Sequence, residues 1–109
     1  SAWILEVEKP IGFLVVHDKI NECEIMNIAV LPQCQRKGYG QQLLAHAMAY
    51  AESKNFSRLC LEVRASNAAA ISLYHAAGFI DVGLRKNYYP KGHEREDAVL
   101  MTLVLTAHH

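Results

Sequence analysis

The segment from Gln35 to Gly40 has the residue types needed to hold a phosphate. It reads Gln-Arg-Lys-Gly-Tyr-Gly and lies between a strand-like apolar run and a helical pattern. Glycines at positions i and i+2 let the backbone approach an anion without an intervening Cβ. The N–H groups and dipole of a helix N-terminus favour negative charge, and Arg36 and Lys37 add positive charge. The pattern predicts a diphosphate site, and a turn that merely caps the helix is an equally weighted alternative.

The same loop excludes two common nucleotide motifs. It lacks the Gly-Lys-Ser/Thr ending of a P-loop, and no acidic strand end follows it as in dinucleotide-binding folds. Neither a nucleoside triphosphate nor NAD is therefore expected here.

Glu62 and Tyr74 are two side chains that could transfer protons. Glu62 lies in an apolar run that alternates in polarity, and Tyr74 follows twelve residues later in a helical pattern. Residue type alone favours a half-exposed strand carboxylate for Glu62 and a core aromatic for Tyr74. Their pattern by itself therefore does not establish catalysis.

The cysteines and histidines favour neither a metal site nor a disulfide bond. The three cysteines are widely spaced and form no Cys-x-x-Cys pair, and no His-x-x-His or His-Glu-x-x-His spacing occurs. Cys60 is expected to be a packed thiol and not an acyl carrier. His108 and His109 resemble the remainder of a purification tag and carry no functional argument.

Hydrophobic periodicity predicts eight elements that would position these residues. The expected strands are Trp3–Val7, Gly12–His17, Glu22–Val30, Leu59–Val63, about Phe79–Tyr88 and Ala98–Leu105. The expected helices run over 38–54 and 68–77. Asn55 and Gly78 would end them, and Ser66 or Asn67 would cap the second. A polar loop with Pro90 and Gly92 is expected between the last two strands.

This order predicts an α/β (α+β) fold with a mixed, mostly antiparallel sheet and packing helices. The strand over 22–31, the helix over 38–54 and the strand over 58–64 form one βαβ unit, which pairs its two strands in parallel. The carboxyl ends of these two strands meet at one edge, where open α/β sheets bind ligands. That edge would bring the Gln35–Gly40 loop close to Glu62.

Composition indicates one soluble globular domain over residues 1–109. The 109 residues are 51% hydrophobic and carry 11 basic and 11 acidic side chains, so the net charge is zero. A nucleic-acid partner is disfavoured because such partners are held by positive charge. No stretch suits a membrane span or a signal peptide, so a cytoplasmic location with no membrane partner is expected.

Four stretches together resemble the GNAT superfamily of N-acetyltransferases, over about Glu24–Leu103. Within it, they are most similar to the RimI family of ribosomal-protein-alanine N-acetyltransferases. The stretches are the Gln-x-x-Gly-x-Gly loop after Ile28-Ala29-Val30, LEVRASNAAAISLYHAAGF (61–79), NYYP (87–90) and REDAVLM (95–101).

The resemblance implies acetyl-CoA as cosubstrate, and no metal. Backbone groups of Ile28, Ala29 and Val30 would contact its pantetheine arm, and Asn67 would bond to that arm besides capping the second helix. The residues that would bind its pyrophosphate are Arg36, Lys37, Gly38, Tyr39, Gly40 and Gln41.

The resemblance also assigns the reacting groups. Glu62 would be the general base and Tyr74 the general acid that protonates the leaving thiol. Tyr88 and Tyr89 would bind the acceptor, and at most one of them would face it because neighbouring strand residues point to opposite faces. Arg64 is expected in a surface ion pair with Glu94, Glu96 or Asp97.

The implied activity is acetylation of a protein α-amine, typically the N-terminal alanine of a ribosomal small-subunit protein. An α-amine is roughly a tenth neutral at pH 7, whereas a lysine amine, with a pKa of about 10.4, is almost wholly charged. A single carboxylate can therefore suffice for the α-amine. The alternatives are a GNAT enzyme acting on lysine or small amines, and a non-catalytic acyl-CoA-binding module.

The chain departs from the family pattern at two places. Members of the family begin with a strand and two helices ahead of the strand expected at Trp3, so the domain is expected to be incomplete at its N-terminus. Apolar sheet surface left uncovered there would favour a homodimer. Leu31 is apolar where relatives often carry an acidic residue.

Overall fold

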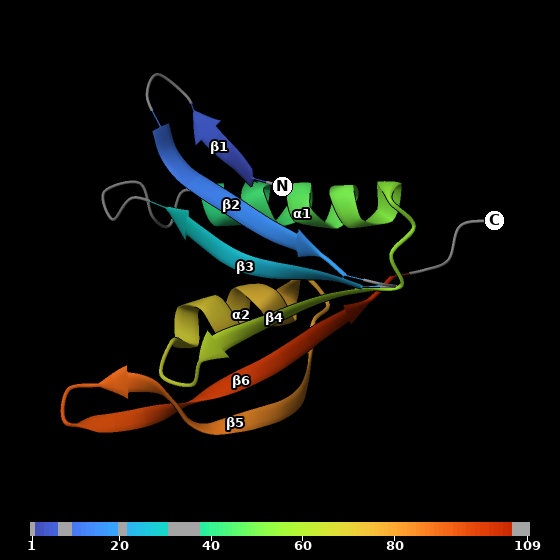
Figure 1. Cartoon of the computed structure of the whole chain (residues 1–109). Helices are drawn as coiled ribbons and strands as arrows, with labels where there is room; N and C mark the ends of the chain where they lie inside the picture. The colour runs from blue at the N-terminus through green and yellow to red at the C-terminus, as the bar shows by residue number, and fades with distance from the viewer. Residues whose placement is uncertain (1, 7–9, 20–21, 31–37, 106–109) are drawn as a thin grey trace.

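The computed structural model describes residues 2–6, 10–19, 22–30 and 38–105. Its elements follow the order expected from the sequence (Figure 1). They are β1 (Ala2–Glu6), β2 (Pro10–Asp18), β3 (Glu22–Val30), α1 (Tyr39–Ser53), β4 (Arg58–Arg64), α2 (Ala68–Ala76), β5 (Ile80–Lys91) and β6 (Glu94–Val104).

The strands form one six-stranded sheet in the order β1-β2-β3-β4-β6-β5. β3 and β4 are parallel, and the other neighbouring pairs are antiparallel. The predicted mixed sheet with one parallel pair, joined through α1, is therefore confirmed. Neither helix in the described part of the chain is long and apolar enough to cross a membrane.

Both helices pack on one face of this sheet. Leu59, Leu61 and Val63 of β4 lie in the same buried cluster as Leu44 of α1 and Tyr74 of α2. The residues between them on β4 face the other way and are partly exposed. We call that side the open face of the sheet, and it carries Cys60, Glu62 and Arg64. The alternation expected for this strand is thus confirmed.

The helix ends follow their local chemistry. The Asn67 side chain accepts a hydrogen bond from the N–H of Ala70, 3.2 Å away, which confirms Asn67 as the N-cap of α2. Asn55 follows the C-cap of α1 with φ 60°, and Gly78 follows that of α2 with φ 106°. These left-handed conformations stop each helix and turn the chain into the next strand.

The expectation of a polar loop between the last two strands is wrong. β5 continues to Lys91 and β6 begins at Glu94, so only Gly92 and His93 connect them. Polar side chains do not prevent ladder pairing on a strand wetted by solvent, and proline is tolerated in an edge strand such as β5. The hairpin therefore carries the two adjacent tyrosines inside a strand.

Candidate functional site

The N-terminus of α1 has the form of an anion site. Gly38 precedes the helix with φ 83°, and no side chain among the described residues caps this end. The first helical bond runs from the N–H of Gln42 to the Gly38 carbonyl, at 3.1 Å. The N–H groups of Tyr39, Gly40 and Gln41 therefore have no partner within the helix and can bind a phosphate. Arg36 and Lys37 lie outside the described residues.

Gly40 lies beside the second helix. A Cβ placed on Gly40 would lie 3.4 Å from Cδ2 of Leu73 in α2, an ordinary van der Waals distance. The first turn of α1 therefore lies near α2, the helix that carries Tyr74.

β3 and β4 separate beside this helix end. Their parallel pairing extends from Glu22 opposite Arg58 to Ile25 opposite Leu61, and within the described strands it goes no further. Figure 1 shows the two strands diverging towards their carboxyl ends. Ile28, Ala29 and Val30 pair with β2 on one side only, so their other edge can hydrogen-bond an extended amide-bearing ligand. This edge is where the pantetheine contacts were predicted.

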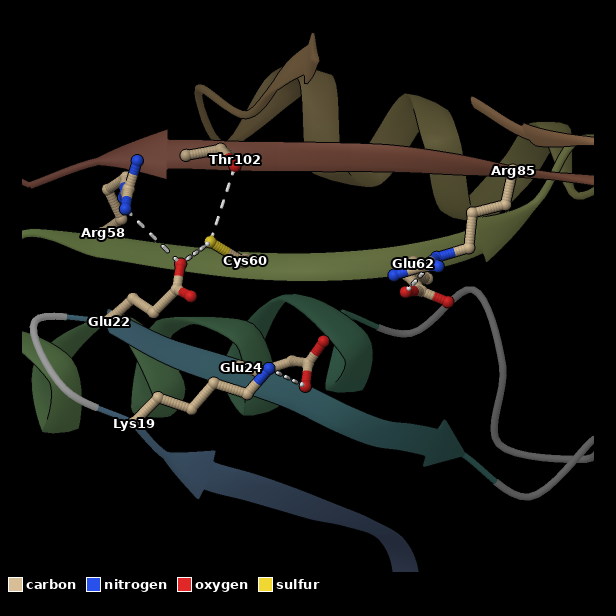
Figure 2. Close-up of polar contacts among 8 residues, drawn as sticks. All are labelled: Lys19, Glu22, Glu24, Arg58, Cys60, Glu62, Arg85 and Thr102. Atoms are coloured by element: carbon tan, nitrogen blue, oxygen red, sulfur yellow. Dashed lines mark hydrogen bonds and ion pairs between the residues drawn. The ribbon is translucent and has the colours of Figure 1, made fainter. Parts of the chain in front are cut away.

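Glu62 lies on β4 immediately beyond the last pair of that ladder. Its side chain is on the open face with 20% of its surface exposed. Nε of Arg85 on β5 donates to Oε1 of Glu62 at 2.9 Å (Figure 2). Sequence reasoning missed Arg85, because the contact crosses a strand and depends on an irregular pairing of β5.

Tyr74 lies in α2 with its ring in the core. The ring packs against Phe79 with centroids 5.8 Å apart. Burial raises the pKa of the Tyr74 hydroxyl, and the nearby Tyr89 adds to the effect. Among the described residues, no group hydrogen-bonds this hydroxyl. Tyr74 therefore keeps its proton at neutral pH and can donate it.

The expectation that Tyr88 and Tyr89 face opposite ways is wrong, because their rings meet edge to face with centroids 5.0 Å apart. The pairing of β5 with β6 is irregular between Arg85 and Tyr89, and Asn87 has φ 54°. This kink breaks the alternation that a regular strand would impose.

Tyr89 links the two candidate catalytic groups. Burial raises the pKa of its hydroxyl, and the next largest effect is the negative charge of Glu62. Ionisation of Tyr89 would also raise the pKa of Tyr74, after the larger effect of burial. Tyr89 of β5 is therefore near both Glu62 of β4 and Tyr74 of α2.

Arginines hold the tyrosine segment in place. Arg64 donates to the carbonyl of Pro90 at 2.8 Å, and its guanidinium carbon lies 4.5 Å from the ring centroid of Tyr89. It also pairs with Glu96 at 3.4 Å, which confirms the predicted ion pair.

Arg95 contacts the backbone of the same segment. It donates to the carbonyls of Asn87 at 2.7 Å and Tyr88 at 2.8 Å. The sequence contains both arginines, but nothing in it identifies backbone carbonyls as their partners.

Cys60 has the environment of a structural thiol. Its Sγ lies 3.2 Å from Oε2 of Glu22 and accepts from Thr102 at 3.5 Å. Burial, with Glu22 adding to it, raises the pKa of the thiol, so little nucleophilic thiolate forms. No cluster of potential metal ligands occurs within the described ranges.

The two described thiols are expected to react slowly. Burial raises the pKa of the Cys23 thiol to about 11, and that of Cys60 is raised too. Since an ordinary cysteine has a pKa of about 8.5, iodoacetamide at pH 8 should label Cys23 roughly a hundredfold more slowly in the folded protein than in urea. Mass spectrometry of the peptides measures both rates, and equal rates would contradict the prediction.

A family model described as Acetyltransferase (GNAT) family matches residues 1–79. A ribosomal protein bS18-alanine N-acetyltransferase of Escherichia coli K12 is 44% identical over 98 residues, which are 90% of this chain and 66% of that protein. The enzyme of that name from Haemophilus influenzae is 41% identical over 94% of this chain and 70% of its own length. The chain thus spans about two thirds of the curated relatives it matches.

Solved structures agree with this fold. The ribosomal-protein-S18-alanine N-acetyltransferase of Escherichia coli superposes with a TM-score of 0.89 at 41% identity, over 96% of this chain and 68% of the other. A GNAT family acetyltransferase of Elizabethkingia anophelis with acetyl-CoA bound gives 0.86 at 28% identity, over 95% and 75%.

Proposed function

The chain belongs to the GNAT family of acetyltransferases, and on that basis we propose that it acetylates the α-amine of a protein N-terminus with acetyl-CoA. The observation that carries this proposal is the position of Glu62. This carboxylate lies on the open face of β4, where β3 and β4 separate, and, after the larger effect of burial, its charge raises the pKa of the nearby Tyr89. The proposal thus has a base beside a strand edge that can bind an amide, with Tyr74 of α2 as the acid.

Two backbone features fit the cosubstrate. The N–H groups of Tyr39, Gly40 and Gln41 would hold the pyrophosphate at the start of α1, with Arg36 and Lys37 adding charge. The free edge of β3 at Ile28–Val30 would hold the pantetheine arm as an added strand. Acetyl-CoA supplies the activated acetyl group as a thioester. The Oδ1 of Asn67 already caps α2, so its amide nitrogen would contact the arm.

The side chains of this chain would move the two protons. Glu62 accepts a proton from the acceptor amine, directly or through a water, as the new nitrogen–carbon bond forms and the carbon–sulfur bond breaks. Tyr74 donates its hydroxyl proton to the leaving sulfur and regains one from solvent. Because the leaving thiol is a better acid than tyrosine, Tyr74 assists this departure without being indispensable.

The proposed acceptor is a protein N-terminus, which the packed rings of Tyr88 and Tyr89 would contact. Relatives of the chain are named ribosomal protein bS18-alanine N-acetyltransferase, so a protein terminus that begins with alanine is the proposed acceptor. An α-amine also needs less help from one carboxylate than a lysine amine does.

A peptide assay tests this function. The protein is incubated with acetyl-CoA and a peptide that begins Ala-Arg, and mass spectrometry locates the acetyl group. The control is the same peptide with a blocked N-terminus and one lysine. Transfer to the free terminus is expected; transfer to lysine alone would replace the proposal with the lysine alternative. Acetyl-CoA binding without any turnover would favour a non-catalytic module.

A further inference from the structure

Three carboxylates on the open face each pair with one cation (Figure 2). Glu24 pairs with Lys19 at 3.2 Å and Glu22 with Arg58 at 3.8 Å, both near the start of β3. The pair between Glu62 and Arg85 is shorter, at 2.9 Å. This pair contains the proposed base, so Arg85 can affect the reaction directly.

Arg85 reaches Glu62 across β6. In the sheet register, Ala98 of β6 lies between Arg85 of β5 and Arg64 of β4. Neighbouring strands are about 4.8 Å apart, so the two side chains together span roughly two strand spacings. Glu62 itself lies opposite Leu100, two residues along β6 from Ala98, so the contact between Arg85 and Glu62 is diagonal in the register.

The bond occupies one oxygen of the carboxylate. Nε of Arg85 donates to Oε1, and no other described residue bonds to Glu62. Oε2 is therefore left to accept a proton from an amine. Arginine remains protonated in proteins, so Arg85 cannot itself remove that proton.

The same guanidinium contacts the acceptor side of the site. Its central carbon lies 5.5 Å from the ring centroid of Tyr88, within the range of a cation–π contact. Arg85 therefore joins the proposed base on β4 to a proposed acceptor-binding tyrosine. Most exposed ion pairs contribute little to stability, but a cation that fixes the orientation of a base acts on the rate.

We propose that Arg85 is a positioning residue that holds Oε1 of Glu62 and thereby presents Oε2 to the acceptor amine. The proposal rests on the proposed function of Glu62 as the base. Its effect should be on kcat and not on KM for acetyl-CoA, because Arg85 contacts neither the start of α1 nor the free edge of β3.

Steady-state kinetics of five variants test the proposal: Arg85→Gln, Arg85→Lys, Arg58→Gln, Glu62→Gln and the double variant at 62 and 85. Arg85→Gln should lower kcat about ten- to fiftyfold, with KM for acetyl-CoA changed less than about twofold. Arg85→Lys should recover part of the loss by restoring the charge. Arg58→Gln removes an equally exposed arginine from the same face and should match the parent.

The double variant separates positioning from a merely structural role. If Arg85 acts through Glu62, adding Arg85→Gln to Glu62→Gln should lower kcat by less than about twofold further. Thermal unfolding identifies any variant that is not folded. If Arg85→Gln is not folded, Arg85→Lys replaces it in the comparison. With the parent active, the proposal would be overturned if the losses in kcat of Arg85→Gln and Glu62→Gln multiplied in the double variant. Equal kcat values for Arg85→Gln and Arg58→Gln would overturn it as well. A parent chain that acetylates no amine would instead overturn the proposed function, and this role with it.

Discussion

Glu62→Gln is expected to lower kcat by roughly 10²- to 10⁴-fold, the usual contribution of a positioned general base. The amide has the shape of the carboxylate and can still accept from Arg85, but it cannot take a proton from the acceptor amine. KM for acetyl-CoA should stay nearly unchanged, since Glu62 is not among the groups proposed to bind it. Initial rates with the alanine-starting peptide, at saturating acetyl-CoA, measure the effect.

Glu24→Gln is the matched control for this experiment. Glu24 is a partly buried carboxylate on the neighbouring strand, and it also pairs with one cation, Lys19. Its removal alters the charge of the sheet equally but leaves the proposed site intact, so kcat should match the parent. If both variants retained full activity, Glu62 would not be the base.

Gly38→Asp is expected to weaken acetyl-CoA binding by roughly ten- to a thousandfold. A carboxylate about 4 Å from a phosphate is repelled by about 1 to 4 kcal/mol, depending on the local dielectric. Gly38 has φ 83°, a conformation that Asp and Asn adopt more readily than other non-glycine residues. Asp also caps helices well, so a loss of binding would not reflect a loss of α1. Calorimetric titration with acetyl-CoA measures the dissociation constant.

Gly38→Asn is the isosteric neutral partner in the same titration. It carries nearly the same steric and backbone cost as Gly38→Asp without the charge. The difference between the two variants therefore isolates the repulsion of the pyrophosphate. Equal affinities for both would mean that no anion binds at the start of α1, and the glycines would then only shape the turn.

The sequence alone predicted the order of the elements and the parallel pairing of β3 with β4. These features follow from local periodicity and from the handedness of a βαβ unit. It also predicted the caps of α2, because Asn67 and Gly78 act through bonds and dihedral angles within a few residues. The division of β4 into a buried face and an open face with Glu62 depended on simple alternation in the same way.

Features that depend on contacts between distant segments could not be predicted. The polar composition around Pro90 suggested a loop, but pairing between β5 and β6 extends both strands to the turn at Gly92. The kink before Tyr89 then brings the two tyrosine rings together. A bulge arises from the register of two strands, and composition alone does not specify that register.

Residue type and local pattern specify the chemically able residues and the elements that carry them: a glycine loop at the start of α1, Glu62 on β4 and Tyr74 on α2. How these residues meet depends on the assembled sheet. The strand order placed β6 between β4 and β5, and Arg85 reaches across it to Glu62. Such a contact joins residues 23 positions apart through a third strand, so it exists only once the sheet has assembled.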